Sequence, residues 1–182
     1  MLQAASKAVG GAVAVMASVG CASPGPYGYA RTYVPIDGEQ AEVDGAREYD
    51  PVMSTRRPKE WKAKPVQLFA VVSSRAPGPD GFTLMNVSMR RAEDRNLCSD
   101  ESSESCRVTV TAKAFATLQV LVKLAPQDDA GPGRVEPGSL LRLVGKLESV
   151  GGDGTPVLRA SWYRHWPGDQ YVTTAAREHM RR

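Results

Sequence analysis

The sequence predicts an all-β domain, built as a small closed or partly open barrel of five or six strands. Short runs of alternating apolar and polar residues recur along the chain, and turns rich in Gly and Pro separate them. The clearest example is residues 138–166, where two β-rich runs flank the turn Gly151-Gly152-Asp153-Gly154. A glycine-rich turn between two such runs is typical of a β-hairpin.

The earlier strands are predicted from the same alternation. Residues 66–72 form a first strand, residues 76–81 a turn, and residues 82–91 a second strand. A short β-branched run follows at 107–111 and a longer one at 115–124. A helix over 112–124 remains an alternative for the last of these, because Phe115, Leu118 and Val122 also fit helical spacing.

The final hairpin has two distinguishable faces. Leu141, Leu143 and Leu147 fall on one face of its first strand, with Arg142 and Lys146 on the other. In its second strand the same alternation groups the apolar positions Leu158, Ala160 and Trp162. We therefore expect Trp162 to pack inside the barrel.

The order of these elements resembles the OB-fold over residues 65–166. The run PGSLLRLVG at 137–145 looks like the glycine-led fourth strand of that fold, and residues 157–163 look like its fifth. The chain departs from the usual pattern in having little helix between the third and fourth strands. A lipocalin-like barrel or a sandwich is the alternative architecture.

The first twenty residues predict export. Lys7 is their only charged residue, and an apolar run that is too short to span a bilayer leads to Val19-Gly20-Cys21. This junction resembles the lipobox of bacterial lipoproteins, which implies a signal peptide over 1–20 and a lipid on Cys21. Ordinary secretory cleavage after Ala22 is the alternative.

The cysteine count agrees with export. The chain has three cysteines, an odd number, and Cys98 and Cys106 flank a polar loop across which they can form a disulfide. Cys21 is then left over for the lipid. In a reducing compartment Cys98 and Cys106 would instead suggest metal or redox chemistry.

Two further segments complete the predicted organisation. Residues 21–64 contain several prolines and glycines without sustained periodicity, which predicts a lipidated N-terminus and flexible linker, called the tether below. Residues 167–182 are a tail with a short helix predicted over 174–182. The organisation is therefore signal peptide, tether, barrel and tail.

No enzymatic motif is present. The sequence lacks GxSxG, HExxH, P-loop and CxxC patterns, and its only histidines are His165 and His179. Its carboxylates lie in the tether and in loops, without the apolar setting that tunes a catalytic pKa. We therefore expect no enzyme activity, no cofactor and no metal.

Binding is the remaining class of function. The candidate ligand contacts are Arg90, Arg159, Tyr163, His165 and Trp166. The small net charge of +3 and the predicted export argue against nucleic acid, so we expect the lipid-anchored barrel to meet the membrane and an envelope protein or glycan. The resemblance to lipoproteins, with no acidic residue after Cys21, implies the outer membrane. The alternative is a secreted OB-fold protein that binds single-stranded nucleic acid or oligosaccharide.

Overall fold

A computed structural model describes residues 31–33, 35–93, 95–96, 108–148 and 155–175. The elements are β1 (Arg31–Thr32), α1 (Glu39–Val43), β2 (Arg47–Glu48), α2 (Pro51–Arg56), α3 (Pro58–Ala63), β3 (Val66–Pro77), η1 (Pro79–Gly81), β4 (Thr83–Arg90), β5 (Arg95–Asn96), β6 (Val108–Val110), β7 (Thr117–Val122), α4 (Pro126–Asp129), β8 (Leu140–Leu147), β9 (Val157–Trp166) and β10 (Tyr171–Thr173).

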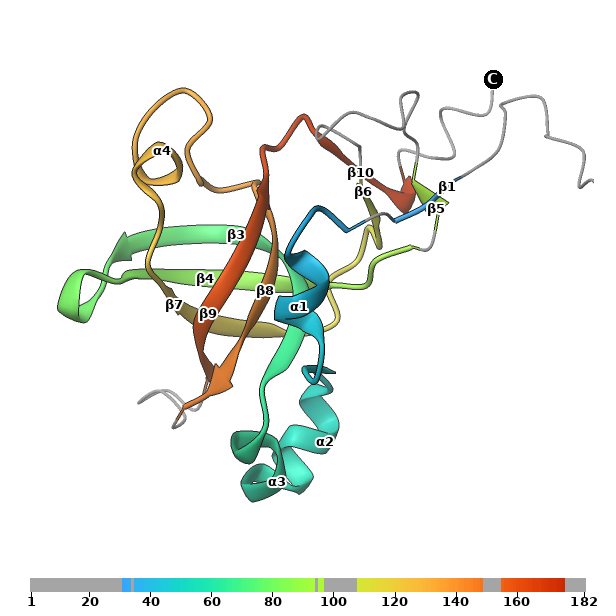
Figure 1. Cartoon of the computed structure of the whole chain (residues 1–182), viewed down its shortest axis with the longest axis vertical. Coiled ribbons are helices and arrows are strands. Elements are labelled where there is room, and N and C mark those ends of the chain that lie inside the picture. Colours follow the sequence, from blue (N-terminus) through green and yellow to red (C-terminus); the bar gives the residue numbers. More distant parts are fainter. Residues whose placement is uncertain (1–30, 34, 94, 97–107, 149–154, 176–182) are drawn as a thin grey trace, which may run out of the picture.

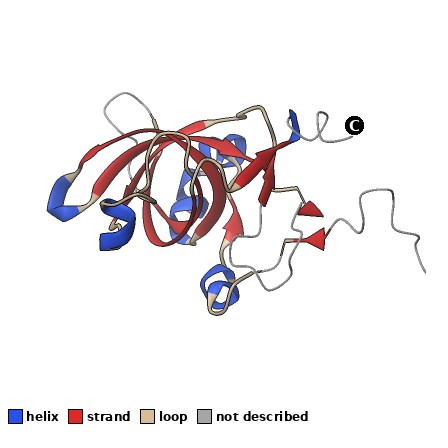
Figure 2. Cartoon of the chain, turned by 90° about the horizontal axis from the view of Figure 1, so that it is seen from above, coloured by secondary structure: helices blue, strands red, loops and turns tan. Residues whose placement is uncertain are grey.

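The main sheet is a closed five-stranded barrel with one extra strand. Its strand order is β2-β3-β4-β7-β9-β8, and an additional pairing of β3 with β8 closes the barrel (Figure 1). The barrel pairings are antiparallel except for β7 with β9, which is parallel. Figure 2 shows the strands wrapping into the barrel with the short helices outside it. This connectivity confirms the predicted all-β, OB-like fold.

The barrel core is formed by the inward positions of each strand. Leu141, Leu143 and Leu147 are buried together, as their alternation predicts. Leu118 and Val120 of β7 join the same core, so residues 117–122 form a strand and the helical alternative is excluded for them. The remaining core positions follow the same two-residue period in β3, in β4 and in the first part of β9, up to Ala160.

The hairpin of β8 and β9 forms as predicted, but a bulge changes the direction of its second half. Val144 pairs with Trp162 while Gly145 pairs with Ala160, so Ser161 is one extra residue in β9. This insertion reverses the alternation of inward and outward side chains. Trp162 is therefore outward and only half-buried, and the prediction that it packs inside the barrel is wrong.

The predicted tether is folded over much of its length. Residues 35–64 include α1, β2, α2 and α3, and Tyr49 and Trp61 are buried in the barrel core. Helix α2 has a good N-terminal cap, because the Asp50 carboxylate accepts a hydrogen bond from the Met53 backbone N–H and Pro51 follows it. The two aromatic side chains bury enough surface to order a segment that has no long apolar run.

A smaller second core lies on the outside of the barrel. Strands β6 and β10 pair in parallel. Val108 and Val110 of β6 are buried against Leu140 and Trp166 of the barrel strands. The Tyr171 hydroxyl donates a hydrogen bond to the Gly138 carbonyl over 2.9 Å. The first part of the predicted tail, up to residue 175, is thus ordered against the barrel.

Some predicted features lie outside the described residues. These are the signal peptide, Cys21, the Cys98–Cys106 pair and most of the helix expected over 174–182. Among the residues that the structure describes, no helix is long and apolar enough to cross a bilayer.

Candidate functional site

The outer surface of β4 and β7 is the candidate site. The described α-helices lie elsewhere (Figure 1), and only the short η1 lies at its edge, in the turn before Phe82. Helix α1 is held against β8 and β9, α2 and α3 project from the barrel, and α4 contacts the end of β9. Three cross-strand pairs lie on the side of the sheet away from the core, namely Leu84–Leu121, Asn86–Gln119 and Ser88–Thr117, although Leu121 is itself only 7% exposed. Together with the residues at its two ends, we call this surface the β4–β7 face.

One end of the face is formed by Phe82. The Lys123 ammonium lies 5.0 Å and the Arg159 guanidinium 4.5 Å from the centre of its ring. The tight turn before β4 positions this ring. Gly78 donates a hydrogen bond to the Phe82 carbonyl over 2.8 Å, and a Cβ at Gly78 would lie only 2.9 Å from that oxygen.

A cleft of about 290 Å³ opens beside Phe82. Its position follows from the strand pairing: β7 and β9 pair only as far as Leu121 with Arg159, and beyond that point the two strands separate. Lys123 and Trp162 line the cleft. An aromatic ring, an indole and an ammonium group therefore meet at this end of the face.

The opposite end has a similar arrangement. Phe115 precedes β7 and is 41% exposed, and the Arg91 guanidinium lies 5.2 Å from the centre of its ring. Arg90 lies next to it, and its guanidinium donates to the Thr111 and Ala112 carbonyls. Each end of the face thus combines an accessible aromatic ring with a cation.

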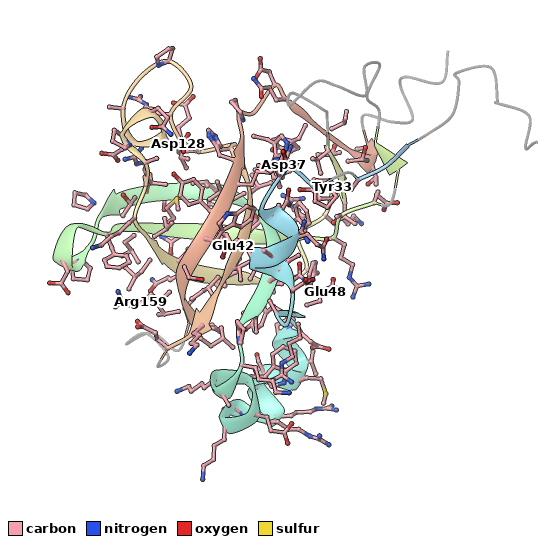
Figure 3. The ribbon with its side chains drawn as sticks, in the orientation of Figure 1. Tyr33, Asp37, Glu42, Glu48, Asp128 and Arg159 are labelled. Carbon is pink, nitrogen blue, oxygen red and sulfur yellow. The ribbon has the colours of Figure 1, made fainter. Side chains whose placement is uncertain are left out.

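The predicted ligand contacts divide between the face and the interior. Arg159 is at the Phe82 end, where its Nε donates to the Glu148 carboxylate over 2.5 Å, and Arg90 is at the Phe115 end. Figure 3 shows Arg159 on the opposite side of the barrel from Tyr33 in that view. Trp166 is only 1% exposed, in the second core, so its burial does not support a role in ligand contact.

Tyr163 and His165 take part in an internal hydrogen-bond network. The Tyr163 hydroxyl donates to Asp128 over 2.7 Å and accepts from the Ala125 backbone N–H. His165 lies between Asp128 and the Ser139 hydroxyl. Burial raises the pKa of Tyr163 to about 12, with a further contribution from Asp128, and burial lowers the pKa of His165 against the opposing effect of Asp128. Both side chains close the end of the barrel.

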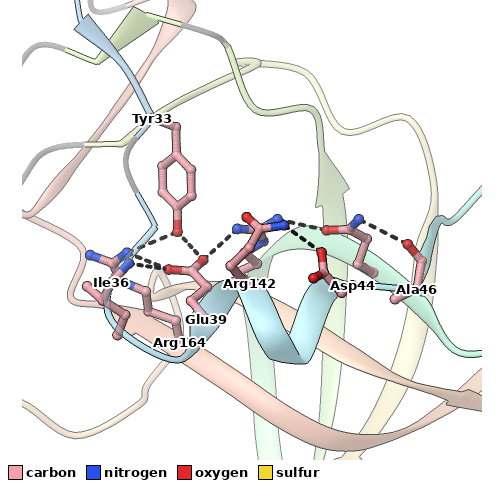
Figure 4. Close-up of polar contacts among 9 residues, drawn as sticks. Tyr33, Ile36, Glu39, Asp44, Ala46, Arg142 and Arg164 are labelled. Atoms are coloured by element: carbon pink, nitrogen blue, oxygen red, sulfur yellow. Dashed lines mark hydrogen bonds and ion pairs between the residues drawn. The ribbon is translucent and has the colours of Figure 1, made fainter.

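The outer surface of β8 and β9 is already occupied by the N-terminal segment. The Glu39 carboxylate is fully buried and accepts hydrogen bonds from Arg142 at 2.5 Å and Arg164 at 2.8 Å (Figure 4). It also accepts from the Tyr33 hydroxyl and the Ile36 backbone N–H. This network fixes α1 across the two strands and leaves the part of their surface around Arg142 and Arg164 unavailable to a ligand.

The Glu39 carboxylate is held in its charged form. Burial raises its pKa, but the hydrogen bonds from Tyr33, Ile36, Arg142 and Arg164 outweigh burial and hold the pKa below its ordinary value. The pKa of Tyr33 is raised to about 12, chiefly by burial and further by the hydrogen bond that its hydroxyl donates to Glu39. The network is therefore a stable ionic anchor for the N-terminal segment.

The β4–β7 face is suited to binding. The partly exposed Phe82 ring and the exposed Phe115 ring can stack on flat ligand groups, the central amides and hydroxyls can form hydrogen bonds, and the cations can pair with anions. Among the described residues there is no group of three or more His, Cys, Asp and Glu side chains placed to hold a metal ion.

Sequence reasoning did not identify Phe82, Phe115, Lys123 or Trp162 as site residues. Phe82 follows a predicted turn and Phe115 begins a predicted strand, so their positions were available, but their exposure depends on how the barrel closes. The bulge in β9 has no clear sequence signal, and it alone brings Trp162 to the surface.

The chain matches no family model and no curated protein. Among solved structures it is similar to the protein PriB from Ralstonia solanacearum, with 21% identity and a TM-score of 0.31, over 56% of this chain and 97% of that one. It is also similar to the single-stranded DNA binding protein from Thermus aquaticus, as a deletion mutant, with 18% identity and a TM-score of 0.30 over 57% of this chain and 50% of that one. At this level the likeness concerns the fold.

One expectation about partners is corrected by this finding. The low net charge and predicted export argued against nucleic acid, yet the chain resembles structures that include a single-stranded DNA binding protein. The net charge of the whole chain does not by itself exclude nucleic acid, because it does not report how cations and aromatic rings are distributed over the surface.

Proposed function

We propose that this protein is a non-catalytic binding module that holds single-stranded nucleic acid along the β4–β7 face. The observation that carries the proposal is the arrangement at the two ends of the face. Phe82 lies beneath Lys123 and Arg159 at one end, and Phe115 lies beneath Arg91 at the other. Between them runs a strip of amide and hydroxyl side chains on a surface that no described α-helix covers.

The chemistry of the face matches that of single-stranded nucleic acid. Bases present flat rings that stack on aromatic side chains, at about 1–3 kcal/mol per base, and the phosphates between them pair with cations. Strand β4 is 8 residues long, so the two rings are separated by about 25 Å. That length accommodates several nucleotides and agrees with OB-fold binding sites, which cover about 4–16 nucleotides.

The proposal predicts that the two phenylalanine rings contribute to affinity. Phe82→Ala and Phe115→Ala should each weaken binding of a labelled oligothymidine by about 5- to 150-fold, which corresponds to one lost stacking contact. Fluorescence anisotropy at fixed salt measures this effect. Ile36→Ala is the matched control, because Ile36 is an exposed apolar residue of 39% exposure that lies away from the face.

Two results would contradict the proposal, the first by excluding the β4–β7 face as the site and the second by excluding nucleic acid as the ligand. The first is an oligothymidine affinity that neither phenylalanine substitution changes. The second is tight binding of a neutral oligosaccharide that both substitutions abolish, since OB-like barrels bind oligosaccharides with the same face. In that case the rings would stack on sugars and the cations would contribute little.

We also propose that Cys21 carries the protein's membrane anchor. The proposal is supported by the Val19-Gly20-Cys21 junction and by the odd number of cysteines. Mass spectrometry of the mature protein should find an acylated Cys21 as the first residue. An unmodified N-terminus at Ser23 would show ordinary secretory cleavage after Ala22 instead.

A further inference from the structure

The strongest concentration of positive charge lies outside the barrel, on α2 and α3. Residues 56–64 contain five cations and one carboxylate, a net charge of +4 within nine residues, whereas the whole chain has a net charge of +3. The cations are Arg56, Arg57, Lys59, Lys62 and Lys64. We call this element the basic helix pair.

All five cations of the basic helix pair are exposed. Only Arg57 has a recorded ion pair, with Glu60 at 3.7 Å, and both side chains of that pair are about 60% exposed. An exposed pair of this kind contributes little stability. The cations therefore have no evident role in holding the fold together and remain available to an anionic partner.

The basic helix pair is nevertheless fixed to the barrel. Trp61 is only 6% exposed, packs edge-on against Tyr49 and has the Arg47 guanidinium 3.6 Å from the centre of its ring. Arg47 also donates to the Glu60 carbonyl, and Ser54 donates to the Tyr49 hydroxyl. Because these contacts position the backbone of both helices, the cations lose little backbone freedom on binding.

A pocket of about 240 Å³ lies between the Phe115 end of the β4–β7 face and the segment that leads into α2. Glu48 and Tyr49, which come just before the Asp50 cap of α2, form part of its lining, and Arg90 and Phe115 at the end of the face form another part. A nucleic-acid strand that leaves the face at Phe115 can therefore continue along this pocket toward the segment before α2, although none of residues 56–64 lines the pocket itself. Figure 1 shows α2 and α3 projecting from this region.

We infer that the basic helix pair binds the phosphate backbone of the same single strand and extends its path beyond the Phe115 end. The inference rests on the proposed function and adds a second, purely electrostatic part to that site.

An anionic membrane fits less well, because α2 and α3 are 6 residues each and Val52 is their only large exposed apolar residue. Helices that lie in a membrane interface bury a broad apolar face.

The test compares a short and a long oligothymidine, of about 6 and about 20 nucleotides, since a single OB-fold site starts at about 4. The variant replaces Arg56, Arg57, Lys59 and Lys62 by Gln together. We expect its affinity for the short oligonucleotide to stay within about two-fold of wild type. Its affinity for the long one should fall, and the slope of log K against log salt should drop by about 2–3, at about 0.7 per lost phosphate contact.

Glu60→Gln is the matched control, and its effect on affinity is expected in the opposite direction. It removes the only carboxylate of residues 56–64, so it should strengthen binding of the long oligonucleotide. Circular dichroism and thermal melting of both variants check that the exposed substitutions leave the fold intact.

The outcomes separate this inference from the proposed function. If wild type binds neither oligonucleotide, the proposed function fails. If wild type binds both and the four-fold variant binds the long one with unchanged affinity and salt slope, the inference fails while the proposed function stands. Loss of binding to anionic phospholipid vesicles, with binding of the long oligonucleotide unchanged, would overturn the inference in favour of a membrane.

Discussion

Glu39→Ala is expected to lower the free energy of unfolding by about 3–5 kcal/mol, the cost of removing one partner from a buried ionic group. The Glu39 carboxylate is fully buried between Arg142 and Arg164, whose side chains are 11% and 9% exposed. Without it, two guanidinium groups face each other with no counter-charge. Chemical denaturation of the purified protein measures the loss.

Glu42→Ala is the matched control for this prediction. Glu42 lies on the same short helix, but its side chain is exposed, so its removal should change the free energy of unfolding by less than about 0.5 kcal/mol. Equal, small effects of the two substitutions would mean that α1 is not anchored to β8 and β9 through Glu39.

The same network predicts how stability depends on pH. The folded-state pKa of Glu39 lies below its ordinary value of 4.5, so the unfolded chain binds a proton at this carboxyl more readily than the folded one. The contribution of Glu39 is therefore fully present above about pH 4.5 and is lost as the pH falls through the folded-state pKa. In Glu39→Gln this part of the acid destabilisation should be absent.

Gly145→Ala is expected to destabilise the barrel by at least about 1–3 kcal/mol, the usual cost of overpacking a core. A Cβ at this position would lie 2.2 Å from the Arg159 carbonyl oxygen and 2.8 Å from the Ala160 Cα. Both are backbone atoms of the neighbouring strand, so the substitution can be accommodated only by moving β9 away from β8. The bulge that places Trp162 at the surface lies at this point.

Gly133→Ala is the comparison for Gly145→Ala. A Cβ at Gly133 would meet no atom within 4 Å, so that substitution should be neutral or slightly stabilising. Thermal unfolding of the two variants side by side measures the difference. A Gly145→Ala protein with wild-type stability would show that β8 and β9 are not in close contact there.

The sequence allowed the barrel to be predicted because its strands carry their pattern locally. The alternation of Leu141, Leu143 and Leu147 defines a buried face regardless of what lies opposite. The turn before Phe82 and the hairpin of β8 and β9 were likewise readable from short stretches. Features that depend on one or a few neighbouring residues were therefore recovered.

Features that depend on distant partners were not predicted. Residues 35–64 look like a linker because their burial rests on isolated residues, with Tyr49 and Trp61 inserted into the barrel core and Glu39 inserted between two arginines more than a hundred positions away. One extra residue in β9 turns both Trp162 and Trp166 to the outside of the barrel, and Trp166 is buried there because the second core covers it. The β4–β7 face is likewise assembled only when the barrel closes.

The most direct test of the central claim is to map where a single strand contacts the protein. Backbone amide chemical shifts, followed by NMR during titration with a short oligothymidine, provide that map. We predict that the changes concentrate in β4, β7 and the turn at 78–82, with the indole signal of Trp162 among them. Changes confined to the surface around Tyr33 and Trp166, or no changes at all, would contradict the assignment of the β4–β7 face as the binding site.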